Sequence, residues 1–381
     1  MATPMHGYFD YNASSLLRPQ AAAALAAWID SGGGNPSSMH ARGRRARIEI
    51  EDARRSVASL ADGAVARDVV FTSGATESNN TVLRGFAAAM PEATLVTSVV
   101  EHHSLVATVD DLETRGHRIV RLAARSDSSL DLAPLASLGA GPVLVSLGLA
   151  NGESGAILAV DSLLAAAPAG AFVHLDVAQA AGRLLLPFGG RIDALSMSGH
   201  KFGSPPGIGA LVVSPRLRGL LRPLLTGGPQ EWSMRAGTPN VPGIVAMGAA
   251  ARASLEGMDT EQRRLAAIRN GLWQRLRTTL PGIVRITPDD GLANTLTIAL
   301  EGCSADSLIA ALDLEGFCIS AGSACAAGSP EPSHVMKALG LAPQYHGGVL
   351  RISAGWGTQR DDADALADAL ERTIRRARQA A

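Results

Sequence analysis

Aromatic residues are scarce in this chain of 381 residues, and no long uninterrupted apolar run is present. Aromatic side chains make up 4% of the chain and charged side chains 18%, with a formal net charge of −1 at pH 7. A chain this close to neutrality lacks the net positive charge that is typical of proteins that bind nucleic acid or an anionic membrane. The longest apolar stretches, Ala21–Ile29 and Leu163–Val173, are too short or too interrupted by Pro and Gly to span a bilayer. We therefore expect neither a nucleic-acid-binding protein nor a membrane protein.

Cysteine is also rare, and the chain contains only three cysteines, Cys303, Cys318 and Cys325. Three cysteines do not make a disulfide framework, and their spacing does not match that of a zinc site. The first residues, Met1–Gly7, lack the basic and apolar regions of a secretion signal. These features predict a cytoplasmic, reducing location and no metal centre.

Strand-like apolar runs alternate with helical periodicity through the first two thirds of the chain. Such alternation is typical of an α/β fold with a mostly parallel sheet and helices on both faces. The predicted strands are Asp68–Thr72, Thr94–Ser98, Arg118–Leu122, Pro142–Leu147, Ala171–Leu175, Ala194–Ser198 and Ile208–Val213. The predicted helices are Arg42–Ala61, Glu77–Met90, Leu105–Arg115, Val160–Ala167 and Val241–Ser254.

The pattern changes near residue 257, where we place a domain boundary. Residues 13–256 are predicted to form a large domain, and residues 1–12 together with 257–381 a smaller α+β domain. Its predicted helices are Thr260–Leu280, Ser304–Leu314, Pro332–Leu339 and Arg360–Ala380, and its predicted strands are Ile283–Ile286, Asn294–Leu300, Phe317–Ser320 and Val349–Ser353.

The stretch Ser198–Lys201 is the most informative part of the chain. A strand ends there, and a desolvated lysine at such a position can form a Schiff base with an aldehyde cofactor. Upstream, a short apolar run ends at Asp176. Enzymes that use pyridoxal 5'-phosphate (PLP) need this pair, a lysine for the aldehyde and an acid for the pyridine nitrogen. The alternative is a surface lysine in a loop and an aspartate that caps a helix.

The segment Phe71–Asn80 combines a strand end, a turn of small residues and the start of a helix. Free backbone N–H groups and the helix dipole make such a helix start an anion site suited to a phosphate, with Thr76 adding a hydroxyl. The alternative is an ordinary helix cap by Ser73 or Thr76.

Two further polar residues follow predicted strands. His102 could stack on a cofactor ring and move protons, or could be a satisfied structural histidine. Asn151 could contact a cofactor, or could simply form the turn that Asn-Gly favours.

The third cysteine, Cys325, lies within the small-residue segment Ser320–Pro330. This composition predicts an exposed, mobile loop, and an accessible thiol is a candidate nucleophile. We interpret Cys318 as a buried residue of an apolar strand and Cys303 as structural.

Taken together, these motifs resemble a cysteine desulfurase of the class V aminotransferase group, which are PLP-dependent enzymes of fold type I. The resemblance runs from Tyr8 to about Thr358, and its specificity lies in the joint order and spacing of the pieces. They are Tyr8–Ala13, Gly34–His40, Phe71–Asn80, Glu101–His103, His174–Gln179, Ser198–Lys201, Arg235–Asn240 and Gly322–Cys325. The long segment that follows the cysteine resembles the iron–sulfur-assembly branch, whose cysteine rides a long mobile loop.

The resemblance implies PLP as cofactor, L-cysteine as substrate, and L-alanine and a persulfide on Cys325 as products. It also implies a homodimer and a sulfur-acceptor protein, such as an iron–sulfur scaffold or a thiolation carrier. The implied catalytic residues are Cys325, Lys201 and His102. The implied cofactor-binding residues are Ala75, Thr76, His102, Asn151, Asp176, Gln179, Ser198, His200, Lys201 and, from the second subunit, Thr238. The implied substrate-binding residues are Asn12, Asn151 and Arg351.

The chain departs from the family pattern at several loops. Tyr11-Asn12 replaces a usual pair of asparagines, and Ser204–Gly207 lacks the lysine common after the Schiff-base lysine. No departure removes a primary catalytic group. The alternatives are a selenocysteine lyase or another PLP-dependent β-elimination or transamination on the same fold, and a catalytically weak scaffold that retains the PLP site.

Overall fold

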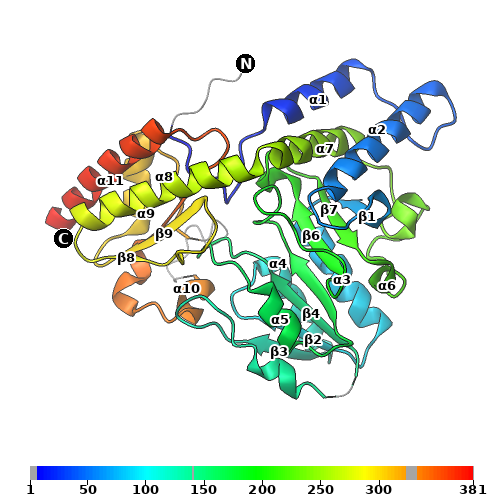
Figure 1. Ribbon diagram of the computed structural model, residues 1–381, viewed down its shortest axis with the longest axis horizontal. Helices are drawn as coiled ribbons and strands as arrows, with labels where there is room; N and C mark the ends of the chain where they lie inside the picture. Colours follow the sequence, from blue (N-terminus) through cyan, green and yellow to red (C-terminus); the bar gives the residue numbers. More distant parts are fainter. Residues whose placement is uncertain (1–6, 140, 323–332, 381) are drawn as a thin grey trace.

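The computed structural model describes residues 7–139, 141–322 and 333–380, which form two β-sheets surrounded by helices (Figure 1). The strands are β1 (Val69–Thr72), β2 (Thr94–Ser98), β3 (Arg118–Leu122), β4 (Val143–Gly148), β5 (Phe172–Asp176), β6 (Ala194–Ser198), β7 (Gly209–Val213), β8 (Ile283–Arg285), β9 (Thr295–Leu300) and β10 (Val349–Ser353). The helices are α1 (Pro19–Asp30), α2 (Ala41–Ala58), α3 (Ala75–Ala89), α4 (His103–Thr114), α5 (Val160–Ala166), α6 (Pro215–Arg218), α7 (Val241–Glu256), α8 (Met258–Thr279), α9 (Ala305–Leu314), α10 (His334–Ala338) and α11 (Arg360–Ala380).

The large sheet has the strand order β1-β7-β6-β5-β4-β2-β3, and β7 alone runs antiparallel to its neighbours. All of its strands except the edge strand β3 are buried, and since successive side chains point to opposite sides, these strands are covered on both faces. In β4, Val143, Val145 and Leu147 belong to one apolar cluster and Leu144 to another. Sheets covered on both faces have nearly continuous apolar strands. The predicted mostly parallel sheet with helices on both faces is confirmed.

Helices α1, α2 and α7 cover one face of the large sheet, whereas α3 and α4 cover the other (Figure 1). Small residues let α2 and α7 approach closely. A Cβ at Gly248 would lie 2.6 Å from the Cα of Ala53, so no larger residue fits there without displacing a helix. On the opposite face, Leu83 and Phe86 of α3 pack against the sheet together with Leu105 of α4.

The small sheet, ordered β10-β9-β8, is antiparallel and packs against α8, α9 and α11 (Figure 1). The N-terminal segment joins this unit. Tyr8 forms a bridge with Cys318 and Asp10 with Ser353, and the side chain of Phe9 is fully buried in the core beneath the small sheet. The chain then passes directly from the small sheet to the carboxyl ends of the large-sheet strands.

Three sequence-based expectations differ from the structure. Phe317–Ser320 was expected as a strand, but its residues form only isolated bridges, to Tyr8 and Arg351. Helix α1 was not predicted, because its alanine-rich sequence was considered only as an apolar stretch. Cys318 is partly rather than fully buried, since its segment lies at the edge of the small unit. Within the described residues, no helix is long and apolar enough to cross a membrane.

Candidate active site

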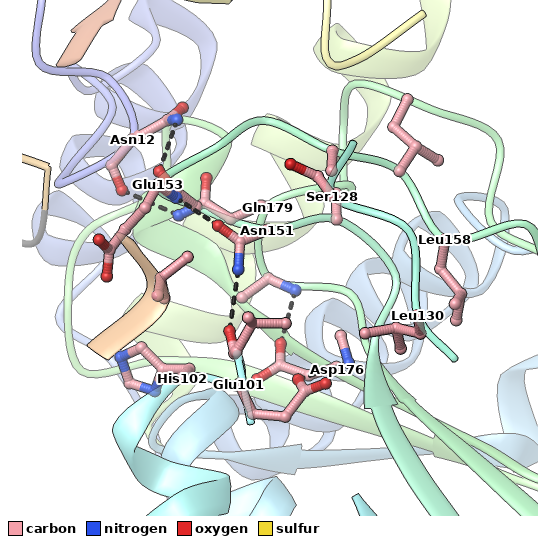
Figure 2. A pocket seen from close by; sticks show the side chains of 18 of the residues that line it. Asn12, Glu101, His102, Ser128, Leu130, Asn151, Glu153, Leu158, Asp176 and Gln179 are labelled. Atoms are coloured by element: carbon pink, nitrogen blue, oxygen red, sulfur yellow. Dashed lines mark hydrogen bonds between the residues drawn. The ribbon is translucent and has the colours of Figure 1, made fainter. Parts of the chain in front are cut away.

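A cavity of about 1010 Å³ lies beyond the carboxyl ends of the large-sheet strands, where ligands bind in open α/β sheets. The small unit contributes Arg351, and the N-terminal segment contributes Asn12. Figure 2 shows Asp176, Glu101 and His102 in one part of its wall. The predicted site residues that line the cavity are Asn12, Ala75, Thr76, His102, Asn151, Asp176, Gln179, Ser198, His200, Lys201 and Arg351.

Polar side chains replace apolar ones on the α3–α4 face of the central strands, close to this cavity. His174 is fully buried between two hydroxyls, with its Nδ1 2.8 Å from Ser146 Oγ and its Nε2 2.8 Å from Ser196 Oγ. Burial lowers the pKa of His174 to about 4, so the ring is neutral. Asp176, two residues further along β5, therefore points to the same face without a charged histidine beside it.

Lys201 lies in a short turn that follows β6. Its Nζ donates hydrogen bonds to the carbonyl oxygens of Asn12 and Ala13, at 2.6 and 3.1 Å. Burial, together with the charges of Arg183 and Arg351, lowers the pKa of Lys201 to about 8. The neutral amine, which is the nucleophilic form, is therefore accessible near neutral pH.

Asp176 ends β5 and is 7% exposed. Its Oδ2 accepts a hydrogen bond from Asn79 Nδ2 at 2.7 Å, and its Oδ1 accepts one from the backbone N–H of Ala178 at 2.9 Å. Asn79 lies on α3, one turn after Thr76. The carboxylate is thus held in place from two elements while it still borders the cavity.

The turn between β1 and α3 supplies the predicted anion site. Helix α3 begins after Gly74, and neither Ser73 nor Thr76 caps it, so the alternative of an ordinary cap by one of these two side chains is wrong. Ser198 Oγ accepts a hydrogen bond from the Ala75 N–H at 2.7 Å, which ties the turn to the end of β6. The close approach requires a glycine on β7, because a Cβ at Gly209 would lie 2.5 Å from the Cα of Gly74.

Two histidines flank this anion site and the carboxylate. Burial and the neighbouring Lys201 lower the pKa of His200 to about 4, and its Nδ1 lies 3.3 Å from Ser14 Oγ. His102 precedes α4, where its Nδ1 accepts the Ser104 N–H at 3.1 Å. Burial lowers the pKa of His102, so the ring is neutral and carries its proton on Nε2. His102 is therefore both a helix cap and part of the cavity wall.

The two amides expected near the cofactor are held by the backbone around them. Asn151 Nδ2 donates to the Val100 carbonyl at 2.9 Å, and its Oδ1 accepts the N–H groups of Glu153 and Ser154. Gln179 Nε2 donates to the Asn12 carbonyl at 3.1 Å. Asn151 thus stabilises the turn that follows it and also lines the cavity.

Arg351, in the middle of β10, is 3% exposed. Its guanidinium donates to Asp10 Oδ1 and Ser320 Oγ, both at 2.9 Å, and to the Gly152 carbonyl at 3.1 Å. Its Nε is buried and has no hydrogen-bond partner among the described residues. The side chain is thus a fixed fork of donors at the cavity.

One predicted site residue of the described chain, Thr238, does not line this cavity. Thr238 is exposed and is absent from the described lining of its own chain's cavity. Cys325 lies outside the described residues. The chain after that segment resumes beside the site, where Ser333 Oγ donates to Glu153 Oε2 at 2.5 Å and His334 lines the cavity. Cys303 is a buried free cysteine in the core of the small unit.

Sequence reasoning missed two buried charged residues. Arg183 donates to the Gln179 Oε1 at 2.9 Å and to the Lys201 carbonyl at 3.3 Å; its place four residues after Gln179 was the available signal. Glu101 accepts hydrogen bonds from Ser98 Oγ and the Gly148 N–H, and burial raises the pKa of Glu101 to about 7.

Sequence reasoning also missed one wall of the cavity. The segment around Ser128 and Leu130 lies across the cavity from Asn12 and Glu153 in Figure 2. Its polar sequence carries no motif that distinguishes it from an ordinary loop. No group of three or more potential metal ligands occurs among the described residues.

The residues present fit PLP. The cavity offers an amine with a lowered pKa, a buried carboxylate and a helix start whose N-cap is a glycine, which match the aldehyde, the pyridine nitrogen and the phosphate. The three groups come from the turn after β6, the end of β5 and the start of α3, and all border the same cavity.

Known proteins resemble this chain along most of its length. A family model described as aminotransferase class-V matches residues 7–366. A protein named "Cysteine desulfurase 2" from Trichormus variabilis is 36% identical over 97% of this chain and 94% of its own length. An "IscS-like cysteine desulfurase" from Mycobacterium tuberculosis is 36% identical over 98% of each chain.

Solved structures also resemble this chain along most of its length. A structure titled "NIFS-LIKE PROTEIN" superposes with a TM-score of 0.89 at 28% identity, covering 97% of this chain and 99% of that one. A structure titled "SspA in complex with cysteine" has a TM-score of 0.78 at 30% identity, covering 91% of this chain and 98% of that one.

Proposed function

Because this chain belongs to the aminotransferase class-V family and is a PLP-dependent cysteine desulfurase, we propose a specific role for each site residue in the removal of sulfur from L-cysteine. Bound PLP supplies the electron sink of the reaction. The observation that carries the assignment is the convergence of Lys201, Asp176, His102 and Arg351 on one cavity.

We propose that residues from several elements hold PLP. Lys201 is the covalent anchor, and Asp176 keeps the pyridine nitrogen protonated, supported by its contact with Asn79. Gln179 contacts the phenolic oxygen, His102 stacks on the ring, and Asn151 approaches it. The phosphate is bound by Ala75, Thr76, Ser198 and His200, and by Thr238 of the partner subunit.

The substrate is bound from the small unit and the N-terminal segment. Arg351 binds the carboxylate of L-cysteine, a task suited to its planar fork of donors. Its buried Nε, which has no partner among the described residues, supports this role. Asn12 and Asn151 line the substrate pocket.

Proton transfer is assigned to Lys201 and His102. The Lys201 amine, with a pKa of about 8, moves the proton at the substrate Cα at neutral pH. The neutral His102 ring assists from Nε2, because its Nδ1 is occupied by the Ser104 N–H.

The sulfur is taken by Cys325. Its thiolate attacks the substrate sulfur and forms an S–S bond while the bond between that sulfur and Cβ breaks. The electron pair of the broken bond stays with the substrate carbon, which gains a proton and leaves as L-alanine. The persulfide on Cys325 is then passed to an acceptor protein, such as an iron–sulfur scaffold or a thiolation carrier.

We further propose a homodimer, since Thr238 is exposed and does not line the described wall of the cavity that the other proposed cofactor-binding residues share. Residues 13–256 form the large domain, and residues 1–12 with 257–381 the small domain that carries the cysteine loop. A cytoplasmic location suits a reaction that requires a free thiol.

One measurement tests the function. Purified protein receives L-cysteine and a reductant, and sulfide and alanine are quantified; equal amounts of both, formed over many turnovers, are expected. Alanine formation from L-selenocysteine alone would instead identify a selenocysteine lyase. Failure to form alanine from either substrate would identify a scaffold that has lost its activity.

A further inference from the structure

Three consecutive residues of the segment that leads to Thr238 adopt left-handed backbone conformations. The φ angles of Glu231, Trp232 and Ser233 are 46°, 55° and 63°. None is a glycine, and side chains make this region unfavourable for L-residues. Such a run persists only where surrounding contacts hold it, and strained backbone is concentrated at functional sites. The contacts that hold this segment therefore indicate what its conformation is for.

Glu231 is held by a buried ion pair. Its carboxylate accepts two hydrogen bonds from Arg54 of α2, at 2.6 and 2.8 Å, and one from the Phe71 N–H at 2.8 Å. The two side chains are 4% and 5% exposed. Arg54 also donates to the Val69 carbonyl at 2.7 Å. Strand β1, which leads into the predicted phosphate turn, is thus bound to the strained segment directly through Phe71 and indirectly through Val69 and Arg54.

Aromatic rings enclose the same guanidinium. Its central carbon lies 4.8 Å from the centre of the Phe71 ring and 4.7 Å from that of Trp232. Both distances are within the range of cation–π attraction. Trp232 is nevertheless 47% exposed, so Arg54 fixes the inner side of a residue that remains on the surface.

A second ion pair anchors the segment closer to Thr238. Arg235 Nε lies 3.0 Å from Glu77 Oε1, in the first turn of α3. The other oxygen of Glu77 accepts the Ser73 N–H at 2.9 Å. The chain between the two anchors is short, and Thr238 follows three residues after Arg235. Its position is therefore set by contacts with β1 and α3.

We propose that Arg54 and Glu231 are a positioning pair, which holds the strained segment so that Thr238 reaches the phosphate site of a second copy of this chain. The inference rests on the proposed function, in which Thr238 acts across the dimer. The pair touches neither PLP nor substrate and acts only through the segment. Glu231→Gln keeps the shape of the side chain but removes the charge that Arg54 binds, so the segment loses its principal restraint.

Mixed dimers test this proposal, because a second chain with Lys201→Ala leaves one covalent PLP site per dimer. The first pair joins a Glu231→Gln chain to a Lys201→Ala chain, so the remaining site receives an unaltered Thr238 segment. The second pair joins a wild-type chain to a chain carrying both Lys201→Ala and Glu231→Gln, so the remaining site receives the altered segment. The PLP dissociation constant is measured from the absorbance of the covalent link, with wild-type plus Lys201→Ala as reference.

The proposal predicts weaker PLP binding in the second pair, by about tenfold or more, and binding close to the reference in the first. Equal weakening in both pairs, weakening in the first pair alone, or no weakening in either would overturn it. Glu51→Gln is the matched control, because Glu51 contacts Arg54 at 3.0 Å from the exposed side and does not touch the segment. It should leave PLP binding at the reference value.

A further pair separates this proposal from its premise. Thr238→Ala replaces Glu231→Gln in the chain that carries Lys201→Ala. Weakening by Thr238→Ala but not by Glu231→Gln overturns the positioning role alone, whereas no weakening by Thr238→Ala overturns the assignment of Thr238 across the dimer. Should Glu231→Gln yield no folded dimer, Trp232→Ala, which removes the exposed ring that contacts Arg54 and Arg218, is carried through the same pairs with the same expectations.

Discussion

Covalent capture of PLP by Lys201 is expected to accelerate about tenfold per pH unit below pH 8 and to level off above it. The lowered pKa of about 8 places the change there, because the neutral amine is the nucleophile. At pH 7 a lysine with a pKa of about 8 is about 9% neutral, whereas a lysine at the ordinary value of about 10.5 is about 0.03% neutral. The structure therefore predicts capture about 300-fold faster than by an ordinary lysine with the same access.

The assay mixes PLP-free protein with PLP in a stopped-flow instrument and follows the absorbance of the covalent link from pH 6 to 10. A rate that still rises about tenfold per unit above pH 9 would refute the reasoning, since it would show an unshifted amine.

Arg183 provides the matched control. Its charge is, after burial, the largest cause that lowers the pKa of Lys201. Arg183→Met removes that charge, so the pKa of Lys201 should rise and the rate should level off at a higher pH. Arg183→Lys keeps the charge and should leave the midpoint near that of the wild type.

Three further substitutions have defined outcomes. Asp176→Asn removes the buried carboxylate charge that faces the pyridine nitrogen and should lower the rate of alanine formation by at least about 30-fold, which corresponds to about 2 kcal/mol. Circular dichroism should show that this variant stays folded. Arg351→Lys should raise the KM for L-cysteine by about tenfold with a smaller change in kcat, because a point charge replaces a two-pronged donor; unchanged initial-rate kinetics would contradict the substrate role. Lys201→Ala should lose the borohydride-reducible link to PLP, and a variant that keeps the link by mass spectrometry would show that another lysine is the anchor.

Much of the large sheet could be predicted from the sequence because most of its strands are short apolar runs bounded by turn residues. In this sheet the bounds of β2, β3 and β6 are as predicted, and those of β4 and β5 differ by one residue at each end. In the small sheet, β10 also has its predicted bounds. The segment Phe317–Ser320 was wrongly expected as a strand, because its few bridges depend on partners, Tyr8 and Arg351, that are distant in the sequence.

The candidate site residues could be predicted where a reactive side chain lies at the end of a predicted strand. Lys201 and Asp176 each follow an apolar strand, and parallel strands bring their carboxyl ends to one edge of the sheet. The supporting contacts were not predictable. Arg183 and Asn79 gain their roles from distances across the fold, such as 2.7 Å from Asn79 Nδ2 to Asp176, that no local pattern encodes. Cys325 remains a prediction, because it lies outside the described residues.

The persulfide on Cys325 is the central claim, and a single-turnover experiment on three cysteine variants tests it most directly. Each variant is loaded with PLP and mixed with L-cysteine, and alanine and protein-bound persulfide are quantified. Cys325→Ala should retain PLP but form almost no alanine and no persulfide, because Lys201 and Arg351 remain while the nucleophile is gone. Cys303→Ala and Cys318→Ala should form both at close to the wild-type rate. Alanine formation by Cys325→Ala at the wild-type rate would contradict the persulfide mechanism.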